Sequence, residues 1–189
     1  RRDPARTYGV LLLDIDKFKI VNDSLGHAVG DRLLVQFARR IRECGRDADT
    51  VARLGGDEFA VLLEDTDFPA GAHAAAERIH GALKVPLVVH GREMYATTSI
   101  GVSVGKPRYE RADDVLRDAD TALYQAKALG RGRHETFTSG MHARVISQMD
   151  LEQDLRDAVQ TCEQFRLHYQ PILALDTGRL VGFEALIRW

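Results

Sequence analysis

The sequence predicts an α/β or α+β fold in which helices cover a central β-sheet. A continuous apolar run over residues 9–14 has the pattern of a buried strand. Two later segments, residues 30–44 and 112–129, instead place apolar side chains at helical spacing. Strand patterns lie between these segments, so helices and strands alternate along the chain. Such alternating elements bury their apolar faces on one another, which favours a sheet covered by helices.

The first half of the chain is predicted to contain a buried strand, a helix and a hairpin. The run over residues 9–14 ends in an acid and is typical of a strand buried on both faces. The helix over residues 30–44 has an apolar face made of Leu33, Leu34, Phe37, Ala38 and Ile41. Strand patterns over residues 50–54 and 59–63 enclose a turn with two glycines, which predicts a β-hairpin.

The next segments also alternate. Pro69 opens an alanine-rich helix that runs to about residue 84, because proline suits the first turn of a helix. The helix over residues 112–129 is expected to end at Gly130, a residue that favours helix C-termini. Strands are expected over residues 85–90, 93–104 and 133–137.

Three parts are expected along the chain. Residues 1–137 form the main domain, and residues 138–162 form a connecting helix. Residues 163–189 hold two β-rich runs around Asp176, Thr177 and Gly178, which predicts a hairpin. Because two strands cannot bury a core of their own, this last part is expected to begin a domain cut short at Trp189, or to pack on another structure.

Composition and charge describe a soluble globular protein. Hydrophobic residues make up 44% and charged residues 29% of the chain, and the net charge is −2 without a basic stripe, so nucleic acid is not an expected partner. Cys44 and Cys162 fit no metal or redox spacing, which favours free thiols in the cytoplasm. No apolar run approaches the roughly 20 residues of a membrane span, so no membrane contact is expected from this segment, although a longer parent protein could be tethered.

The most informative feature is the turn that holds Gly55, Gly56, Asp57 and Glu58. The two glycines let backbone come close to a bulky anionic ligand, and two acidic side chains follow at once. The alternative interpretation is an ordinary hairpin, because Gly-Gly and Gly-Asp are common turn dipeptides. The turn alone does not decide between a phosphate-facing tip and a simple connection.

Acidic residues at the end of the first strand favour the functional interpretation. Asp14 lies at the carboxyl end of that strand, the edge at which many sheet proteins bind ligands, and Asp16 shares its face if the strand continues. Either could instead be a strand-end turn residue. Carboxylates from two strand ends repel unless a cation lies between them, so Asp14 and Asp57 together predict a Mg²⁺ site that substrate phosphates complete.

Four further polar residues have both a structural and a functional interpretation. Lys127 and Arg131 lie four residues apart at a helix end, where cations can interact with the helix dipole or bind a triphosphate. Asn22 could be a turn residue and Asp31 a helix-start residue. Both could equally hydrogen-bond a base, the aspartate accepting from a donor edge such as that of guanine.

Taken in order, these residues resemble the GGDEF family of diguanylate cyclases over roughly residues 7–137. The matching motifs lie, in the family's order and spacing, at residues 14–19, 22–23, 26–27, 30–31, 55–59, 119–120 and 127–131. The fold that the resemblance implies is nucleotidyl-cyclase-like, with a central, mainly antiparallel sheet flanked by helices. A C-terminal helix and a β-hairpin fragment would follow it.

The resemblance also implies a role for each site residue. Asp14 and Asp57 would bind Mg²⁺, or Mn²⁺ in its place, with help from the backbone carbonyl of Ile15. Asp57 and Glu58 would be the catalytic residues, with Glu58 helping to deprotonate the attacking hydroxyl. The residues that would bind GTP are Phe18, Asn22, Asp31, Gly55, Gly56, Lys127 and Arg131.

The implied reaction joins two GTP molecules. The 3′-hydroxyl of one GTP attacks the α-phosphate of the other and releases pyrophosphate, and the reverse attack closes cyclic di-GMP. Asn22 and Asp31 would bind guanine, while Lys127 and Arg131 would hold the β- and γ-phosphates. Each subunit holds one GTP, so catalysis would need a homodimer in which the protein mainly positions the reactants.

Arg46 and Asp49 match the position of the family's inhibitory product site, because five residues separate Asp49 from Gly55. The resemblance implies that this pair binds cyclic di-GMP and holds the two domains apart. As a bare pattern, Arg-x-x-Asp describes an ordinary solvated loop.

The two ends of the chain carry further expectations. Residues 169–172 and 184–189 resemble the first two strands of an EAL phosphodiesterase domain, in which Glu184 would bind metal and Arg188 would contact substrate phosphate. The remaining metal ligands of such a domain are not in this chain, so phosphodiesterase activity is not expected from it. A helix that usually precedes the first strand in the family is also outside the chain, which makes activity of this segment less certain than that of a longer form.

Two other functions stay open beside the cyclase. The domain could be a GTP-binding regulatory module that controls an adjacent EAL phosphodiesterase, as the tandem arrangement suggests. It could also be a product receptor that acts through Arg46 and Asp49 alone. The unbroken signature around Asp57 favours the cyclase.

Overall fold

The computed structural model describes residues 8–64, 68–105 and 111–189. The chain divides into two compact units, with the boundary between His142 and Ala143. Each unit is described by itself below.

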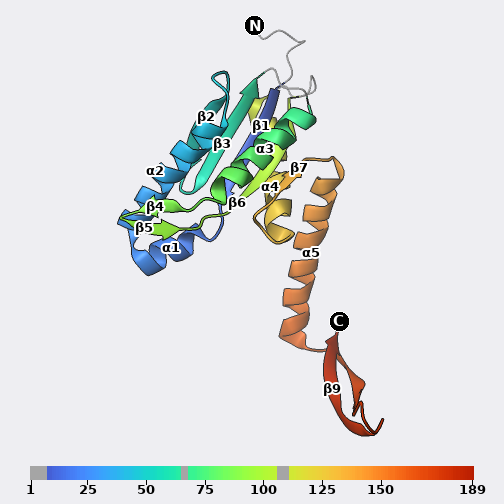
Figure 1. Ribbon diagram of the computed structural model, residues 1–189. Coiled ribbons are helices and arrows are strands. Elements are labelled where there is room, and N and C mark those ends of the chain that lie inside the picture. Colours follow the sequence, from blue (N-terminus) through green and yellow to red (C-terminus); the bar gives the residue numbers. More distant parts are fainter. Residues whose placement is uncertain (1–7, 65–67, 106–110) are drawn as a thin grey trace. The chain divides into compact units, whose positions relative to one another are not determined.

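A five-stranded sheet forms the centre of the first unit (Figure 1). Its strands, in spatial order, are β2 (Thr50–Gly55), β3 (Glu58–Glu64), β1 (Tyr8–Ile15), β6 (Thr98–Val104) and β7 (His134–Thr136). All neighbouring strands are antiparallel except β6 and β7, which are parallel. The predicted class, a central and mainly antiparallel sheet flanked by helices, is therefore confirmed.

Helices cover both faces of this sheet (Figure 1). Helices α2 (His27–Cys44) and α3 (Ala70–Leu83) pack on one face, where their apolar side chains join Leu11, Leu13 and Ile15 of β1 in one core. Helix α4 (Ala112–Ala128) packs on the other face, against Val10 and Leu12 of the same strand. Successive side chains of a strand point to opposite faces, so the unbroken apolar run of β1 serves two cores.

Three elements differ from the sequence-based expectation. Helix α1 (Phe18–Leu25) was not predicted, and α2 begins at His27 rather than at residue 30. The expected strand over residues 93–104 is instead two strands, β5 (Arg92–Met94) and β6, with residues 95–97 between them. Strand β5 pairs with β4 (Leu87–Val89) in a small ribbon of its own.

The backbone of α4 comes close to β6 at Gly101. A Cβ atom at this position would overlap the carbonyl oxygen of Ala119 and the backbone nitrogen of Leu123. Glycine is therefore required here by close packing of helix on strand, because both obstructing atoms belong to backbone that cannot rotate away.

Three histidines join α3 to the edge strand β7. Nδ1 of His73 lies 2.9 Å from Nε2 of His134, and the ring of His80 stacks on that of His134 with centroids 5.6 Å apart. The hydroxyl of Thr136 lies 3.2 Å from Nε2 of His73. Burial, followed by the positive charge of a neighbouring histidine, lowers the pKa of both His80 and His134. The neutral rings are therefore the forms that suit the folded state.

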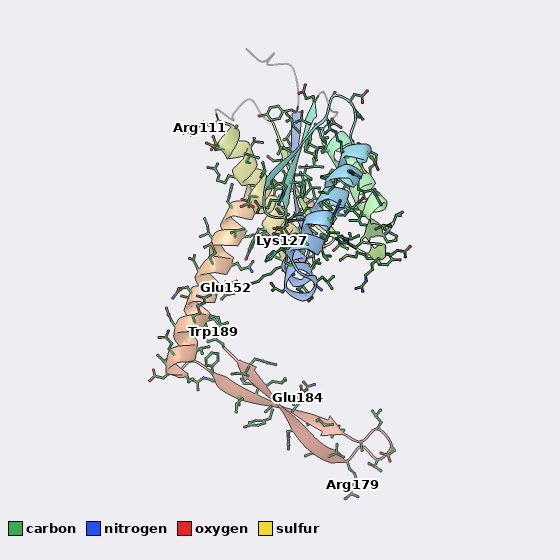
Figure 2. The ribbon with its side chains drawn as sticks, turned by 90° about the vertical axis from the view of Figure 1, so that its left-hand side faces the viewer. Arg111, Lys127, Glu152, Arg179, Glu184 and Trp189 are labelled. Carbon is green, nitrogen blue, oxygen red and sulfur yellow. The ribbon has the colours of Figure 1, made fainter. Side chains whose placement is uncertain are left out.

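The second unit consists of most of α5 (Gly140–Thr161) and an antiparallel hairpin of β8 (Arg166–Leu173) and β9 (Leu180–Arg188). The hairpin buries almost none of its side chains, and Tyr169 and Phe183 remain about 60% exposed. Side chains stand on both sides of its ribbon (Figure 2). Nε1 of Trp189 donates a hydrogen bond of 2.9 Å to Gln164 near the start of the hairpin. The hairpin has no core of its own, as its pattern predicted.

The first turn of α5 belongs to the first unit. Met141 is buried with Ala122 and Phe137, and Nε2 of His142 lies 3.0 Å from the buried carboxylate of Asp118. Within the described residues, none of the helices has the length and apolar character that a bilayer span requires.

The Gly101→Ala substitution is expected to lower the free energy of unfolding by roughly 2–3 kcal/mol, the cost of forcing an extra group into a packed core. Gly81→Ala is the matched control, because a Cβ at Gly81 would meet no atom within 4 Å. Urea unfolding followed by circular dichroism measures both. Equal stability of the two variants would contradict the close approach of α4.

Lowering the pH from 7.5 to 5.5 is expected to reduce the free energy of unfolding. The histidines of the unfolded chain take up protons near pH 6.5, whereas His80 and His134 in the folded state have a lower pKa. The stability they contribute is present above about pH 6.5 and is lost as the pH falls through their folded pKa values.

The same urea experiment at both pH values measures this effect. A double variant, His80→Gln with His134→Gln, should lose less stability on acidification than the unchanged protein. His168→Gln, on the exposed hairpin, should behave like the unchanged protein. An unchanged pH response in the double variant would contradict the assignment.

Candidate functional site

The tip of the β2–β3 hairpin has free space beside its glycines, and a side chain of the hairpin itself holds its backbone. Gly56 has a positive φ of 50°, and a Cβ at Gly55 or Gly56 would lie more than 4 Å from the other described residues, chain neighbours aside. The guanidinium of Arg53 donates two hydrogen bonds, of 2.9 and 2.7 Å, to the carbonyl oxygen of Gly56. The turn therefore has a fixed shape and leaves room beside its glycine backbone.

Asp14 meets this tip because β1 lies beside β3. Asp14 pairs in register with Glu58, and the backbone N–H of Ile15 donates to the carbonyl oxygen of Asp57 at 3.3 Å. Burial raises the pKa of Asp14; the adjacent Lys127 lowers it, and the charges of Asp57 and Asp16 raise it further. Strand pairing thus brings the two predicted metal-binding carboxylates into one electrostatic site.

Lys127 contacts Asp14 directly. Its Nζ lies 2.7 Å from Oδ2 of Asp14, and the two side chains are 32% and 14% exposed. Asp14 shares its strand face with Val10 and Leu12, which pack on α4, so the last turn of α4 brings Lys127 to it. Figure 2 shows Lys127 at the opposite end of α4 from Arg111. In this structure its ammonium group balances a carboxylate, and its role in binding phosphate stays a prediction.

Arg131 lies in an unusual turn after α4. Gly130, Arg131 and Gly132 all have positive φ, of 116°, 63° and 60°. The backbone N–H of Arg131 donates to the carbonyl oxygen of Ala126 at 3.1 Å, which closes the end of the helix. Arg131 itself is exposed.

Asp16 joins three segments around the site and was not predicted as a site residue. Its carboxylate accepts hydrogen bonds from the hydroxyls of Thr97 and Ser99, both at 2.7 Å, and from the backbone N–H of Gly132 at 3.0 Å. The available signal was the alternation of Asp14 and Asp16. The residues that contact Asp16 are far away in sequence, so their identity could not be foreseen.

Asn22 and Asp31 lie in helices rather than in a turn or a helix start. The side-chain oxygen of Asn22, in α1, is buried and has no hydrogen-bond partner among the described residues. A Cβ at Gly30 would overlap that oxygen and would come within 3.2 Å of the ring of Phe18. The missing side chain of Gly30 therefore makes room for the amide of Asn22, next to the residue that precedes Asp31.

Asp31 borders a cavity of about 620 Å³ between α2 and β2. Leu34 and Phe59 are among its apolar lining residues, and Arg39 and Arg42 are among its charged ones. Asp31 follows the first turn of α2, so the alternative that it starts the helix is wrong.

Arg46 and Asp49 form a closed turn between α2 and β2. The backbone N–H of Arg46 donates to Oδ2 of Asp49 at 2.8 Å, and the N–H of Asp49 donates to the carbonyl oxygen of Arg46 at 2.9 Å. Asp49 is half-buried while Arg46 is exposed. The structure thus shows a braced turn that presents one arginine to solvent, and its inhibitory role stays a prediction.

The donor atoms at the tip suit a hard cation. Within residues 8–64, 68–105 and 111–189, no group of three or more His, Cys, Asp or Glu side chains is placed to hold a metal. Mg²⁺ commonly takes only one or two protein carboxylates and completes its shell with water and substrate phosphates. Asp14 and Asp57 fit that mode, because both are carboxylates and the charge of Asp57 raises the pKa of Asp14, which a cation between them would offset.

Comparisons with known proteins identify the family and the fold. The family model for the diguanylate cyclase GGDEF domain matches residues 2–133. Over 180 residues the chain is 42% identical to the cyclic di-GMP phosphodiesterase NbdA of Pseudomonas aeruginosa, covering 95% of this chain and 23% of NbdA. It is 40% identical over 184 residues to the bifunctional diguanylate cyclase/cyclic di-GMP phosphodiesterase MucR of the same species, covering 97% of this chain and 27% of MucR. The chain therefore spans about a quarter of the length of these curated relatives.

Solved structures show the same likeness. The crystal structure of the GGDEF domain of YfiN from Pseudomonas aeruginosa has a TM-score of 0.68 and 40% identity, over 70% of this chain and 83% of that one. The GGDEF domain of DgcB from Caulobacter crescentus, solved in complex with c-di-GMP, has a TM-score of 0.64 and 30% identity, over 69% of this chain and 78% of that one. The sequence motifs, the fold and these comparisons lead to one conclusion: the chain belongs to the GGDEF family of diguanylate cyclase domains.

Proposed function

We propose that this domain condenses two GTP molecules into cyclic di-GMP, with release of pyrophosphate, as a homodimer. The observation that carries the proposal is the meeting of Asp14, Asp57 and Lys127 beside the open glycine tip. Opposite charges at one strand edge can bind both a cation and a triphosphate. One such site per domain holds one GTP, so two domains must face each other to join two GTP molecules.

Asp14, Asp57 and the backbone carbonyl of Ile15 would hold Mg²⁺, or Mn²⁺ in its place. Bound there, the cation supplies charge neutralisation on the phosphates and acidifies the attacking 3′-hydroxyl. Glu58 is exposed and pairs in register with Asp14, which supports a role in accepting the hydroxyl proton. When GTP binds, the ammonium group of Lys127 can leave the Asp14 carboxylate and contact the β- and γ-phosphates. Arg131 would bind the same phosphates.

Guanine recognition is assigned to Asn22 and Asp31. The side-chain oxygen of Asn22 lacks a hydrogen-bond partner in the part of the chain that the structure describes, and Asp31 is a carboxylate that borders a cavity. Both groups accept hydrogen bonds, and the N1–H and N2–H₂ groups of guanine donate them. Phe18 lies against the space left by Gly30 and would pack near the nucleotide.

We also propose that Arg46 and Asp49 form an inhibitory site for cyclic di-GMP. The exposed guanidinium of Arg46 can bind a phosphate of the product, while Asp49 holds the turn that presents it. The turn leads directly into β2, the strand that ends at the catalytic tip.

The hairpin of the second unit is proposed to begin an EAL phosphodiesterase domain over residues 163–189. Its large exposed apolar residues, among them Tyr169 and Phe183, favour packing on further strands. In a complete domain Glu184 would bind metal and Arg188 would contact substrate phosphate, and hydrolysis is not expected without the rest of it. Cys44 and Cys162 are free thiols, which supports a cytoplasmic site of action with GTP.

A second candidate function is a GTP-binding module that regulates an adjacent phosphodiesterase. The relative NbdA, named a cyclic di-GMP phosphodiesterase, favours it because the likeness covers 95% of this chain. Such a module would bind GTP without consuming it. GTP would then raise the phosphodiesterase activity of a longer protein that contains this domain.

Asp57→Ala is expected to abolish formation of cyclic di-GMP, with a loss of more than about 100-fold, because a charge that positions the phosphates is removed. The measurement is chromatography of nucleotides after incubation with GTP and Mg²⁺. Asp150→Ala, on the exposed surface of α5, is the control and should keep the activity of the unchanged protein. If the unchanged protein binds GTP but does not consume it, even at high protein concentration, the regulatory module would be favoured instead.

Arg46→Ala is expected to raise the concentration of cyclic di-GMP that halves the reaction rate by about tenfold, because one phosphate contact is lost. Progress curves with added product measure this, with Arg144→Ala on α5 as the control. The same titration by calorimetry tests the receptor alternative. Unchanged product affinity in Arg46→Ala would exclude both an inhibitory site and a receptor that depend on this residue.

A further inference from the structure

We propose that Asp16 is a positioning residue that holds the Gly130–Gly132 turn against the end of β1 and so directs Arg131 toward the triphosphate. The effect on triphosphate binding rests on the proposed function, whereas the contact between Asp16 and the turn is present in the fold itself. Asp16 then acts through Arg131 and does not touch the substrate.

The contacts of Asp16 join three segments that are distant in sequence. Thr97 precedes β6, Ser99 lies within β6, and Gly132 follows α4, and each donates one hydrogen bond to the carboxylate. The backbone N–H of Asp16 also donates to the carbonyl oxygen of Thr97 at 2.9 Å. One short side chain therefore fixes the end of the metal-binding strand, the start of its neighbour and the arginine turn.

The turn needs an external anchor because its backbone is strained. Arg131 adopts a left-handed conformation, with φ of 63°, between two glycines that also have positive φ. For a residue with a side chain this costs about 1–2 kcal/mol, so the surroundings must hold it. Its bonds to the helix, from Arg131 to Ala126 at 3.1 Å and from Gly130 to Lys127 at 3.4 Å, tie the turn to α4 but not to the sheet. The bond from Gly132 to Asp16 links the turn to the sheet across 116 residues.

Asp14, in β1, and Asp16, just after it, therefore differ in what they contact. The carboxylate of Asp14 faces an ammonium group, that of Lys127, which can move to another anion. The carboxylate of Asp16 uses both oxygens to accept from three neutral donors, two of them at 2.7 Å. A carboxylate with about four acceptor positions has little capacity left for a metal or a ligand. Its hydrogen bonds, rather than its charge, are thus the basis of its role.

This distinction gives a test with two variants at one position. Asp16→Ala removes all three acceptor contacts. Asp16→Asn can keep them, because its amide oxygen can accept from Thr97 and Gly132 while its amide nitrogen donates to the hydroxyl of Ser99. If hydrogen bonding positions the turn, asparagine should restore what alanine loses.

The measurements are calorimetric titrations of the whole chain with a non-hydrolysable GTP analogue and with GMP, in Mg²⁺. Asp16→Ala should weaken binding of the analogue by about tenfold, the size expected when a charged contact is misplaced, and should leave GMP binding unchanged. Asp16→Asn should stay within about threefold of the unchanged protein for both nucleotides. Thr97→Val, which removes one donor without changing Asp16, should give a smaller loss of the same kind.

Amide hydrogen exchange over residues 129–133 gives a readout that does not depend on nucleotide. The N–H of Gly132 should exchange faster in Asp16→Ala, and at the original rate in Asp16→Asn. Thermal unfolding identifies a variant that fails to fold, in which case Thr97→Val carries the test.

Two results would overturn the proposal. Unchanged affinity of Asp16→Ala for the analogue would show that the turn is positioned without Asp16. Equal losses in Asp16→Asn and Asp16→Ala would show that charge, not hydrogen bonding, is required. If the unchanged protein binds neither nucleotide, the proposed function fails, while exchange at Gly132 still decides whether Asp16 holds the turn.

Discussion

The burial of β1 on both faces is the constraint on which the rest of the structure depends. The strand lies between β3 and β6, and its alternate side chains enter two different cores. One core receives α2 and α3, and the other receives α4. Asp14 lies on the face that meets α4, so the acidic end of the strand is brought to the last turn of that helix, where Lys127 contacts it. The location of the site is thus a consequence of how the sheet is covered.

Two carboxylates close together at the end of a buried strand repel each other, and the fold stabilises them in two different ways. Asp14 is paired with the cation at the end of a long side chain, that of Lys127. Asp16 is held by neutral donors that are part of the framework. An ion pair such as Asp14–Lys127 suits a ligand site, because the free energy of this pair can be replaced by that of new contacts with a cation and a phosphate. A carboxylate held by three donors suits a fixed joint. Asp14 and Asp16 are the same residue type, so their different roles follow from the groups that each one contacts.

Much of the fold could be predicted from the sequence because its signals are local. The apolar run of β1 and the helical spacing of α4 need no knowledge of distant residues. Helix α1 was missed because it buries only Phe18 and begins after Lys17, which has a left-handed backbone that no local pattern indicates. The break at residues 95–97 was also missed, since Thr97 there contacts Asp16, 81 residues away. The same limit applies to the site: the neighbourhood of Asp14 and Asp57 follows from adjacent strands, whereas the Lys127 contact depends on how α4 packs.

The contact between Gly30 and Asn22 ties two positions of the chain to each other in evolution. As long as an amide is needed at position 22, a side chain at position 30 would displace it, so selection on Asn22 also acts on Gly30. A chain that no longer needed the amide could change at both positions, but a side chain at position 30 would still have to fit beside the buried ring of Phe18. Gly30 and Asn22 are therefore coupled by the space they share, and a change at one position alters what the other can accommodate.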